Sequence, residues 1–269
     1  MADGRYAINC SIALADVPVT DRAVQARRLG YEAVEFWWPF QSQAPDRDAV
    51  AEFVESVKRA EVETVLLNFP GGGPSVADRG LMCVPGRQED FVGSARTALE
   101  IGRQLGVRRF NPMVGNAAHS WAPDTEAFET AVTNLLAIDS MLGELDAVVV
   151  LEPLSGFPDA ALKTHDDAHQ LVIAARAAGA RNVSMLFDFY HAAVNEDPVL
   201  DSWAVDIGLI GHVQVADAPG RGWPGTGNLP LNAWLQRLHD SGYDGRVGFE
   251  CGGDPLALDT AIRYLGETG

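Results

Sequence analysis

Short apolar runs alternate with helical patterns along the whole chain. Eight runs have the apolar and β-branched composition of buried strands: Tyr6–Cys10, Ala33–Phe36, Thr64–Leu67, Arg109–Asn111, Ala147–Glu152, Val183–Asp188, Ile210–Val215 and Arg246–Glu250. Helical patterns follow at Thr20–Leu29, Arg47–Ala60, Arg87–Leu105, Thr125–Leu142, His165–Ala177, Leu200–Val205, Leu231–His239 and Pro255–Tyr264. Because strands and helices alternate, the pattern predicts an α/β protein with a parallel sheet.

The number of these pairs favours one closed barrel. Eight strands and eight helices in 269 residues fit a (β/α)8 TIM barrel better than an open doubly wound sheet, which periodicity alone does not exclude. No Ser/Gly linker, charge block or low-complexity tract divides the chain. We therefore expect a single TIM-barrel domain over residues 1–269.

Polar side chains stand at the ends of four consecutive strands in the second half. Glu152, Asp188 and Glu250 each close an apolar run, and Gln214 lies near the end of another. The carboxyl ends of barrel strands open onto the face that carries active sites. Each residue alone could begin a solvated loop, but four in succession indicate a site for a hard cation, Mg²⁺ or Mn²⁺.

Charge and cysteine content narrow the possible partners. Lys and Arg number 20 against 37 Asp and Glu, which gives a net charge of −17. This charge repels phosphate backbones and anionic lipid, so we expect neither a nucleic-acid nor a membrane partner. Three cysteines fit a reducing compartment. The chain shows no signal peptide and no apolar stretch near the roughly 18 residues of a membrane helix, and we expect a cytoplasmic protein.

Ordered segments over essentially the whole chain resemble the hydroxypyruvate isomerase family of the xylose isomerase-like barrels. The ordered set is specific, whereas no single segment is. The matching segments are residues 30–36 (GYEAVEF), Asn68, Gly80-Leu81, residues 84–87 (VPGR), 150–155 (VLEPLS), 186–192 (LFDFYHA), 212–217 (HVQVAD), 219–221 (PGR), 225–227 (GTG) and 248–250 (GFE).

The resemblance implies a barrel that binds one divalent ion and isomerises a small 2-keto-3-hydroxy acid. The expected reaction converts hydroxypyruvate to tartronate semialdehyde (2-hydroxy-3-oxopropanoate). Residue by residue, the resemblance implies metal ligands at Glu152, Asp188, Gln214 and Glu250, with Glu152 and Glu250 also as the acid–base pair. This chemistry needs two carboxylates that move a proton between neighbouring carbons and a cation that stabilises an enediolate.

The resemblance also implies residues that contact the substrate, namely His191, Arg221, Asn68 and Arg87. Arg221 is the first candidate for binding the carboxylate of a keto acid, because a guanidinium pairs with a carboxylate through two parallel hydrogen bonds. Arg87 is the second. The competing interpretation makes Arg221 a solvated loop residue paired with Asp217.

Other residues have structural interpretations beside functional ones. Glu35 also ends a strand and is expected to order the mouth of the barrel, while His212 is expected to lie in the core or behind a ligand. Trp37 and Trp38 are expected to form a wall. Relatives often carry Lys after the last glutamate, where this chain has Cys251-Gly252-Gly253-Asp254, and Glu where it has Asn228. These departures leave the identity of the substrate open.

Three other functions compete with the isomerase. One is an epimerase or isomerase for a larger ketose or a 2-oxo-tetronate. The second is a metal-dependent endonuclease, which the net charge of −17 opposes. The third is a non-catalytic ligand-binding barrel, which four intact oxygen ligands oppose. For the hydroxypyruvate isomerase and for the epimerase or isomerase of a larger substrate, the expected partner is a small-molecule keto acid or ketose. The sequence is also compatible with a homo-oligomer.

Overall fold

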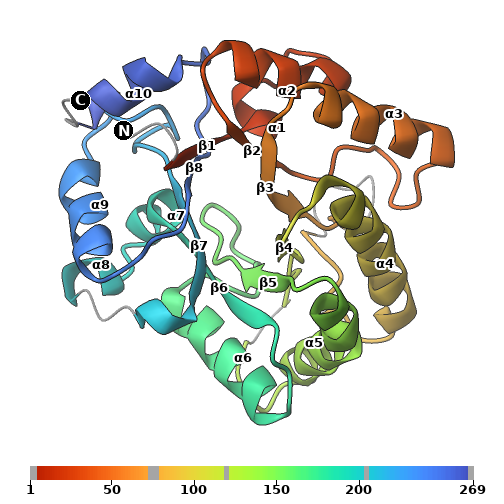
Figure 1. The fold of residues 1–269 in the computed structure, drawn as a ribbon. Helices are drawn as coiled ribbons and strands as arrows, with labels where there is room; N and C mark the ends of the chain where they lie inside the picture. Colours follow the sequence, from red (N-terminus) through yellow and green to blue (C-terminus); the bar gives the residue numbers. More distant parts are fainter. Residues whose placement is uncertain (1–4, 72–78, 118–120, 203–205, 266–269) are drawn as a thin grey trace.

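Eight parallel strands close a barrel in the computed structural model, which describes residues 5–71, 79–117, 121–202 and 206–265. Each strand pairs with its neighbours in chain order, and β8 pairs with β1. Figure 1 looks along this barrel, with the strands at the centre and helices around them. The predicted TIM-barrel class is therefore confirmed. The strands are β1 (Tyr6–Asn9), β2 (Ala33–Phe36), β3 (Glu63–Asn68), β4 (Arg109–Asn111), β5 (Val148–Leu151), β6 (Val183–Asp188), β7 (Ile210–Val215) and β8 (Val247–Phe249).

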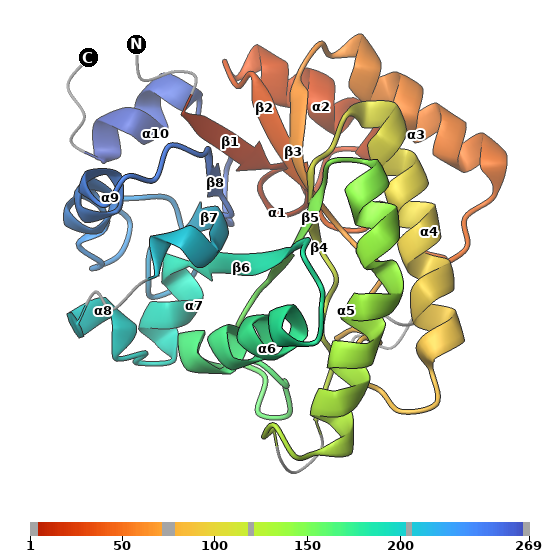
Figure 2. The same ribbon diagram turned by 60° about the horizontal axis from the view of Figure 1, so that its bottom comes forward.

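Helices connect the strands and cover the outside of the barrel (Figure 2). The larger ones are α2 (Val19–Arg28), α3 (Arg47–Arg59), α4 (Gln88–Leu105), α5 (Glu126–Glu144), α6 (His165–Ala177), α9 (Leu231–Asp240) and α10 (Leu258–Tyr264). In place of the predicted Leu200–Val205 helix stands α8 (Val199–Ser202), and residues 203–205 lie outside the described part. Within the described ranges, no helix combines the length and apolar character needed to cross a membrane.

Three short helical segments were missing from the sequence prediction: α1 (Cys10–Ala13), α7 (Phe189–Val194) and η1 (Ile207–Leu209). Both α1 and α7 begin directly after a strand. Asp188 ends β6 and caps α7, because its Oδ1 accepts a hydrogen bond from the backbone N–H of Tyr190 at 2.7 Å. A helix that starts on the last strand residue has no separate polar boundary, and apolar periodicity over so few residues is too weak to reveal it.

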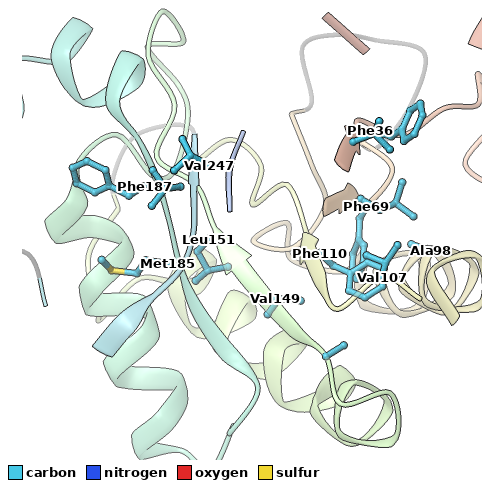
Figure 3. Close-up of a cluster of buried hydrophobic side chains, with 14 of the residues drawn as sticks. Phe36, Phe69, Ala98, Val107, Phe110, Val149, Leu151, Met185, Phe187 and Val247 are labelled. Carbon is cyan, nitrogen blue, oxygen red and sulfur yellow. The ribbon is translucent and has the colours of Figure 1, made fainter. Parts of the chain in front are cut away.

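Alternation along each strand divides its side chains between two layers. In β6, Val183, Met185 and Phe187 belong to the large apolar core, whereas Leu186 belongs to a separate small cluster with Val150 and Leu66. Successive side chains of a strand point to opposite faces, so the large core lies between strands and helices and the small cluster lies inside the barrel. Figure 3 shows part of the large core, including Phe187, Leu151 and Phe110.

The same alternation carries polar residues into the barrel at its carboxyl end. Asp188 has the parity of Leu186, Glu152 that of Val150, and Glu250 that of Gly248. Gly248 is required there, because a Cβ at this position would overlap the carboxylate of Glu35. The inward-facing positions thus change from apolar to polar toward the end of the barrel where the strands finish.

Candidate active site

A cavity of about 490 Å³ lies at the carboxyl ends of the strands. Its lining includes five of the predicted site residues, Glu152, Glu250, His191, Arg221 and, at the end of β3, Asn68. Loops that follow different strands contribute the rest of the wall, namely Trp37, Trp38, Phe69, Gly71, Arg79, Met113, Leu154 and Phe157. Trp37 and Trp38 therefore form a wall, as expected.

Three of the predicted metal ligands each keep a buried oxygen without a hydrogen-bond partner among the described residues. These atoms are Oε1 of Glu152, Oδ2 of Asp188 and Oε1 of Gln214. The other oxygen of each carboxylate is engaged: Glu152 Oε2 accepts from Asn111 at 2.6 Å, and Asp188 Oδ1 caps α7. Buried oxygens without partners are costly, and oxygen donors of this kind suit a hard divalent cation.

Glu250 is held differently from the other carboxylates. Its Oε1 accepts from Nη2 of Arg221 at 2.5 Å and from the indole Nε1 of Trp37 at 3.1 Å. The same Nη2 lies 3.6 Å from Oδ2 of Asp188. Glu152, Asp188 and Glu250 form the acidic cluster of the site, and Arg221 binds to it through Glu250. Arg221 is therefore not a solvated loop residue. Asp217 does not pair with Arg221, because it accepts from the backbone N–H groups of its own loop.

The Nε2 atom of His191 faces Glu152 and Asp188 from beyond hydrogen-bond distance. The backbone N–H of Ser155 donates to its Nδ1 at 2.9 Å. Burial lowers the pKa of His191 to about 4, so the ring is neutral near pH 7 and carries its hydrogen on Nε2. That atom lies 3.6 Å from Oε1 of Glu152 and 3.8 Å from Oδ2 of Asp188. One ligand atom of each of these three side chains lies within 4.8 Å of the others, a spacing that suits a metal ion.

Glu35 fixes the orientation of Gln214 from inside the barrel. Its carboxylate accepts from Nε2 of Gln214 at 2.7 Å and lies 2.6 Å from Nε2 of His212. Because a carboxylate accepts and the amide NH₂ donates, the amide oxygen of Gln214 must point away from Glu35. All three side chains are almost fully buried. Glu35 and His212 thus lie behind a predicted ligand, in agreement with their expected supporting roles.

Burial and repulsion between carboxylates raise the pKa values of Glu152 and Glu250. Burial raises the pKa of Glu152, and the charges of Glu250 and Asp188 raise it further. Burial also raises the pKa of Glu250, although the charge of Arg221 opposes this shift. Burial disfavours the charge on Arg221, yet Glu250, Asp188 and Glu152 raise its pKa above the ordinary value. Perturbed carboxyl groups in a cavity are typical of acid–base catalysis.

These shifts predict how stability depends on pH in the metal-free protein. The folded Glu152 holds a proton that the unfolded chain releases once the pH exceeds the usual carboxyl pKa, so it destabilises the fold as the pH rises. We expect Glu152→Gln to gain stability relative to wild type by up to about 1.4 kcal/mol per pH unit in that range. Urea unfolding in EDTA at several pH values measures this difference, and a difference that is constant with pH contradicts the prediction.

Of the two remaining predicted substrate-binding residues, Asn68 lines the cavity and Arg87 does not. Asn68 lines the cavity, and its Oδ1 is buried without a partner among the described residues. Arg87 is the N-cap residue directly before α4, pairs with Asp90 at 2.5 Å and is not part of the cavity lining. The expectation that Arg87 contacts substrate stays a prediction. Arg79 lies in the cavity wall instead, and nothing in the sequence pattern singled it out, because it belongs to an irregular loop.

Asn111 and Ser155 also act in the site without having been predicted. Asn111 ends β4 and donates to Glu152, and Ser155 orients His191. The position of Asn111 at a strand end was a signal that could have been used, since the same argument selected Glu152. Ser155 lies in a loop, where only the fold shows that it reaches a residue 36 positions away.

Comparisons with known proteins agree with this architecture. A family model described as "Xylose isomerase-like TIM barrel" matches residues 23–268. The protein named "Putative hydroxypyruvate isomerase" of Streptomyces coelicolor is 34% identical over 95% of this chain and 94% of its own length. The hydroxypyruvate isomerase of Escherichia coli is 29% identical over 91% and 92% of the two chains. A 2-oxo-tetronate isomerase of Cupriavidus necator is 29% identical over 97% and 99%.

A solved structure supports the fold independently. The crystal structure described as an AP endonuclease of family 2 from Brucella melitensis superimposes with a TM-score of 0.84 at 25% identity, covering 98% of each chain. The family model and the relatives span almost the whole chain, and their names agree on isomerisation. The chain therefore belongs to the xylose isomerase-like TIM barrel family and, like the relatives that match it along nearly their whole length, is an isomerase.

Proposed function

We propose that this isomerase interconverts hydroxypyruvate and tartronate semialdehyde by proton transfer between Glu152 and Glu250. The observation that carries the proposal is the pair of buried glutamates on one cavity, both with raised pKa values and with Asp188 beside them. They follow β5 and β8, which are separated by β6 and β7 around the barrel. A small substrate bound between them would therefore have the carboxyl group of Glu152 on one side and that of Glu250 on the other.

The reaction moves hydrogen between adjacent carbons without net oxidation. One glutamate, as carboxylate, removes a proton from C3 of hydroxypyruvate, and the C–H electron pair forms the C2–C3 double bond of an enediolate. The other glutamate, as carboxylic acid, returns a proton to C2. The hydroxyl proton of C3 leaves as the aldehyde forms, and the C2 oxygen gains one. Carboxyl groups with raised pKa values are suited to both roles near neutral pH.

The residues fit a divalent ion, Mg²⁺ or Mn²⁺. Glu152, Asp188 and Gln214 would hold it through their oxygens that lack partners, with Glu250 as the fourth ligand that the family resemblance implies. Such an ion supplies positive charge that stabilises the enediolate oxygens. His191 would donate its Nε2 hydrogen to a substrate oxygen. Arg221 has a buried Nε without a hydrogen-bond partner among the described residues.

A second candidate substrate is a four-carbon 2-oxo acid. The similarity to a 2-oxo-tetronate isomerase covers 97% of the chain, and the cavity of about 490 Å³ exceeds the needs of a three-carbon acid. Both acids present the same reacting atoms, so the site chemistry does not separate them. Comparison of kcat/KM for the two acids on the same enzyme preparation decides between them.

Deuterium exchange tests the proposed reaction directly. We incubate the protein with hydroxypyruvate and Mn²⁺ or Mg²⁺ in D₂O and follow both acids by NMR. The proposal expects deuterium at C3 of recovered hydroxypyruvate and at C2 of the product, at a rate above the enzyme-free control. Binding of the acid without such exchange would show a non-catalytic barrel, and exchange confined to larger ketoses would favour an epimerase.

A further inference from the structure

The cavity contains a second guanidinium that the proposed chemistry does not use. Arg79 lines the cavity from the loop between β3 and α4. Its guanidinium carbon lies 3.5 Å from the ring centroid of Phe157, which comes from the loop after β5. A guanidinium over an aromatic face is attracted by the ring and is restricted in orientation. The aromatic ring thus positions the cation but does not neutralise it.

Arg79 and Arg221 differ in how their charges are balanced. Arg221 binds Glu250 and lies 3.6 Å from Asp188. Among the described residues, Arg79 has no carboxylate within ion-pair distance, although the buried Nε of each arginine lacks a hydrogen-bond partner. Burial lowers the pKa of Arg79, and the positive charge of Arg221 lowers it further. Two guanidiniums that repel each other at one cavity are stabilised by an anion that enters it.

The backbone holds Arg79 in place at a conformational cost. Arg79 has a φ of 46°, in the left-handed region that non-glycine residues rarely adopt. The next residue, Gly80, donates its N–H to the carbonyl of Gly71 at 2.8 Å and pairs with Val114. A Cβ at Gly80 would overlap the carbonyl of Met113. These contacts fix the chain directly after Arg79, and such strain in non-glycine residues is concentrated at ligand sites.

The charges around the cavity leave Arg79 in excess. Arg221 is already engaged by the carboxylates of the site, because it binds Glu250 and lies 3.6 Å from Asp188. A substrate carboxylate then adds one negative charge, and Arg79 is the cation in the described cavity wall that remains to balance it. Arg79 lines the same cavity as His191 and Glu152, so it lies near the reacting groups.

We propose that Arg79 binds the carboxylate of the substrate and thereby selects 2-keto acids over neutral hydroxyketones of similar size. This inference rests on the proposed function. Arg221, whose Nη2 is already bound to Glu250, then orients the acid–base pair, and the carboxylate is bound at the Phe157 side of the cavity. A guanidinium suits this task because it can form two parallel hydrogen bonds to a carboxylate.

Substitution of Arg79 tests the proposal through affinity for charged and neutral molecules. We expect Arg79→Gln to raise KM for hydroxypyruvate about 10- to 100-fold, the scale of losing a charge-assisted hydrogen bond, with kcat changed only a few-fold. Arg79→Lys restores part of the affinity. Affinity for dihydroxyacetone, which lacks the carboxylate, stays the same. Arg103→Gln, on the exposed face of α4 and paired with Glu100, serves as the matched control and behaves as wild type.

Calorimetric binding of glycerate separates this inference from the proposed reaction. Glycerate has a carboxylate but no carbonyl to isomerise, so its affinity depends on Arg79 whether or not the enzyme acts on hydroxypyruvate. If glycerate affinity falls in Arg79→Gln while the wild type fails to isomerise hydroxypyruvate, the inference stands and the proposed function is wrong. If hydroxypyruvate is isomerised and Arg79→Gln binds both acids as wild type does, Arg79 is not the carboxylate site. Equal losses for glycerate and dihydroxyacetone also overturn the inference.

Discussion

Replacement of either Glu152 or Glu250 by Gln is expected to lower kcat for hydroxypyruvate by about 10²–10⁴-fold, the scale of general acid–base catalysis. Each substitution keeps the shape of the side chain and one oxygen, but it removes the group that exchanges a proton. If the Gln oxygen at position 152 accepts the hydrogen bond from Asn111, its NH₂ takes the place of Oε1, the proposed metal ligand, so kcat is compared only where the metal site is saturated. Steady-state kinetics at saturating Mn²⁺ measures it.

A matched substitution distinguishes this loss from a general effect of Glu→Gln changes. Glu144 is exposed at the end of α5, and Glu144→Gln should keep the wild-type kcat. Deuterium exchange adds a second measurement, because a variant that lacks the base loses exchange at C3, whereas one that lacks only the acid retains it. Near-normal turnover in both single variants would refute the assignment of the acid–base pair.

Substitution of Asp188 is expected to weaken Mn²⁺ binding at least about 10- to 100-fold, a range typical even for groups that only support a metal ligand. Its Oδ2 is buried without a described hydrogen-bond partner, whereas its Oδ1 caps α7. Asn can keep the cap but loses the charge, while Ala loses both. We therefore expect Asp188→Asn and Asp188→Ala to lose metal affinity alike.

Stability separates the two Asp188 variants. Loss of an N-terminal cap costs about 0.5–2 kcal/mol, so metal-free Asp188→Ala should be less stable than metal-free Asp188→Asn. Calorimetric titration with Mn²⁺ gives the affinity, and urea unfolding in EDTA gives the stability. Wild-type Mn²⁺ affinity in both variants would show that Asp188 is not a ligand, and the role of the cap would be unaffected.

The barrel could be predicted because each strand carries its own apolar signal and each is followed by an element that covers it. The predicted strand ends at Glu152 and Glu250 extend one residue beyond β5 and β8. At these positions the side chain keeps the inward parity of the strand although the residue lies outside it. The alternation of inward and outward side chains therefore predicts which residues face the site even one residue beyond the end of a strand.

The contacts between loops could not be predicted in the same way. Ser155 and His191 meet because the loops after β5 and β6 are neighbours, and Arg79 meets Phe157 across the mouth of the barrel. The spacing of these residues in the sequence does not reveal the contacts. The contacts depend on the conformation of the loops, and backbone angles such as the φ of 46° at Arg79 determine that conformation. The metal ligands themselves stay a prediction that rests on strand ends and on buried oxygens without described partners.

The hydrogen bond that Gln214 donates to Glu35 has a consequence for how this barrel can be divided. Every predicted ligand follows or lies on a strand from β5 to β8, but the residue that orients Gln214 comes from β2. A fragment that contains only the second half keeps the ligands and loses this acceptor, so its Gln214 amide can turn either face to the cation. Fragment complementation should then restore tight Mn²⁺ binding only when the first half carries Glu35, because that half supplies the acceptor that orients Gln214.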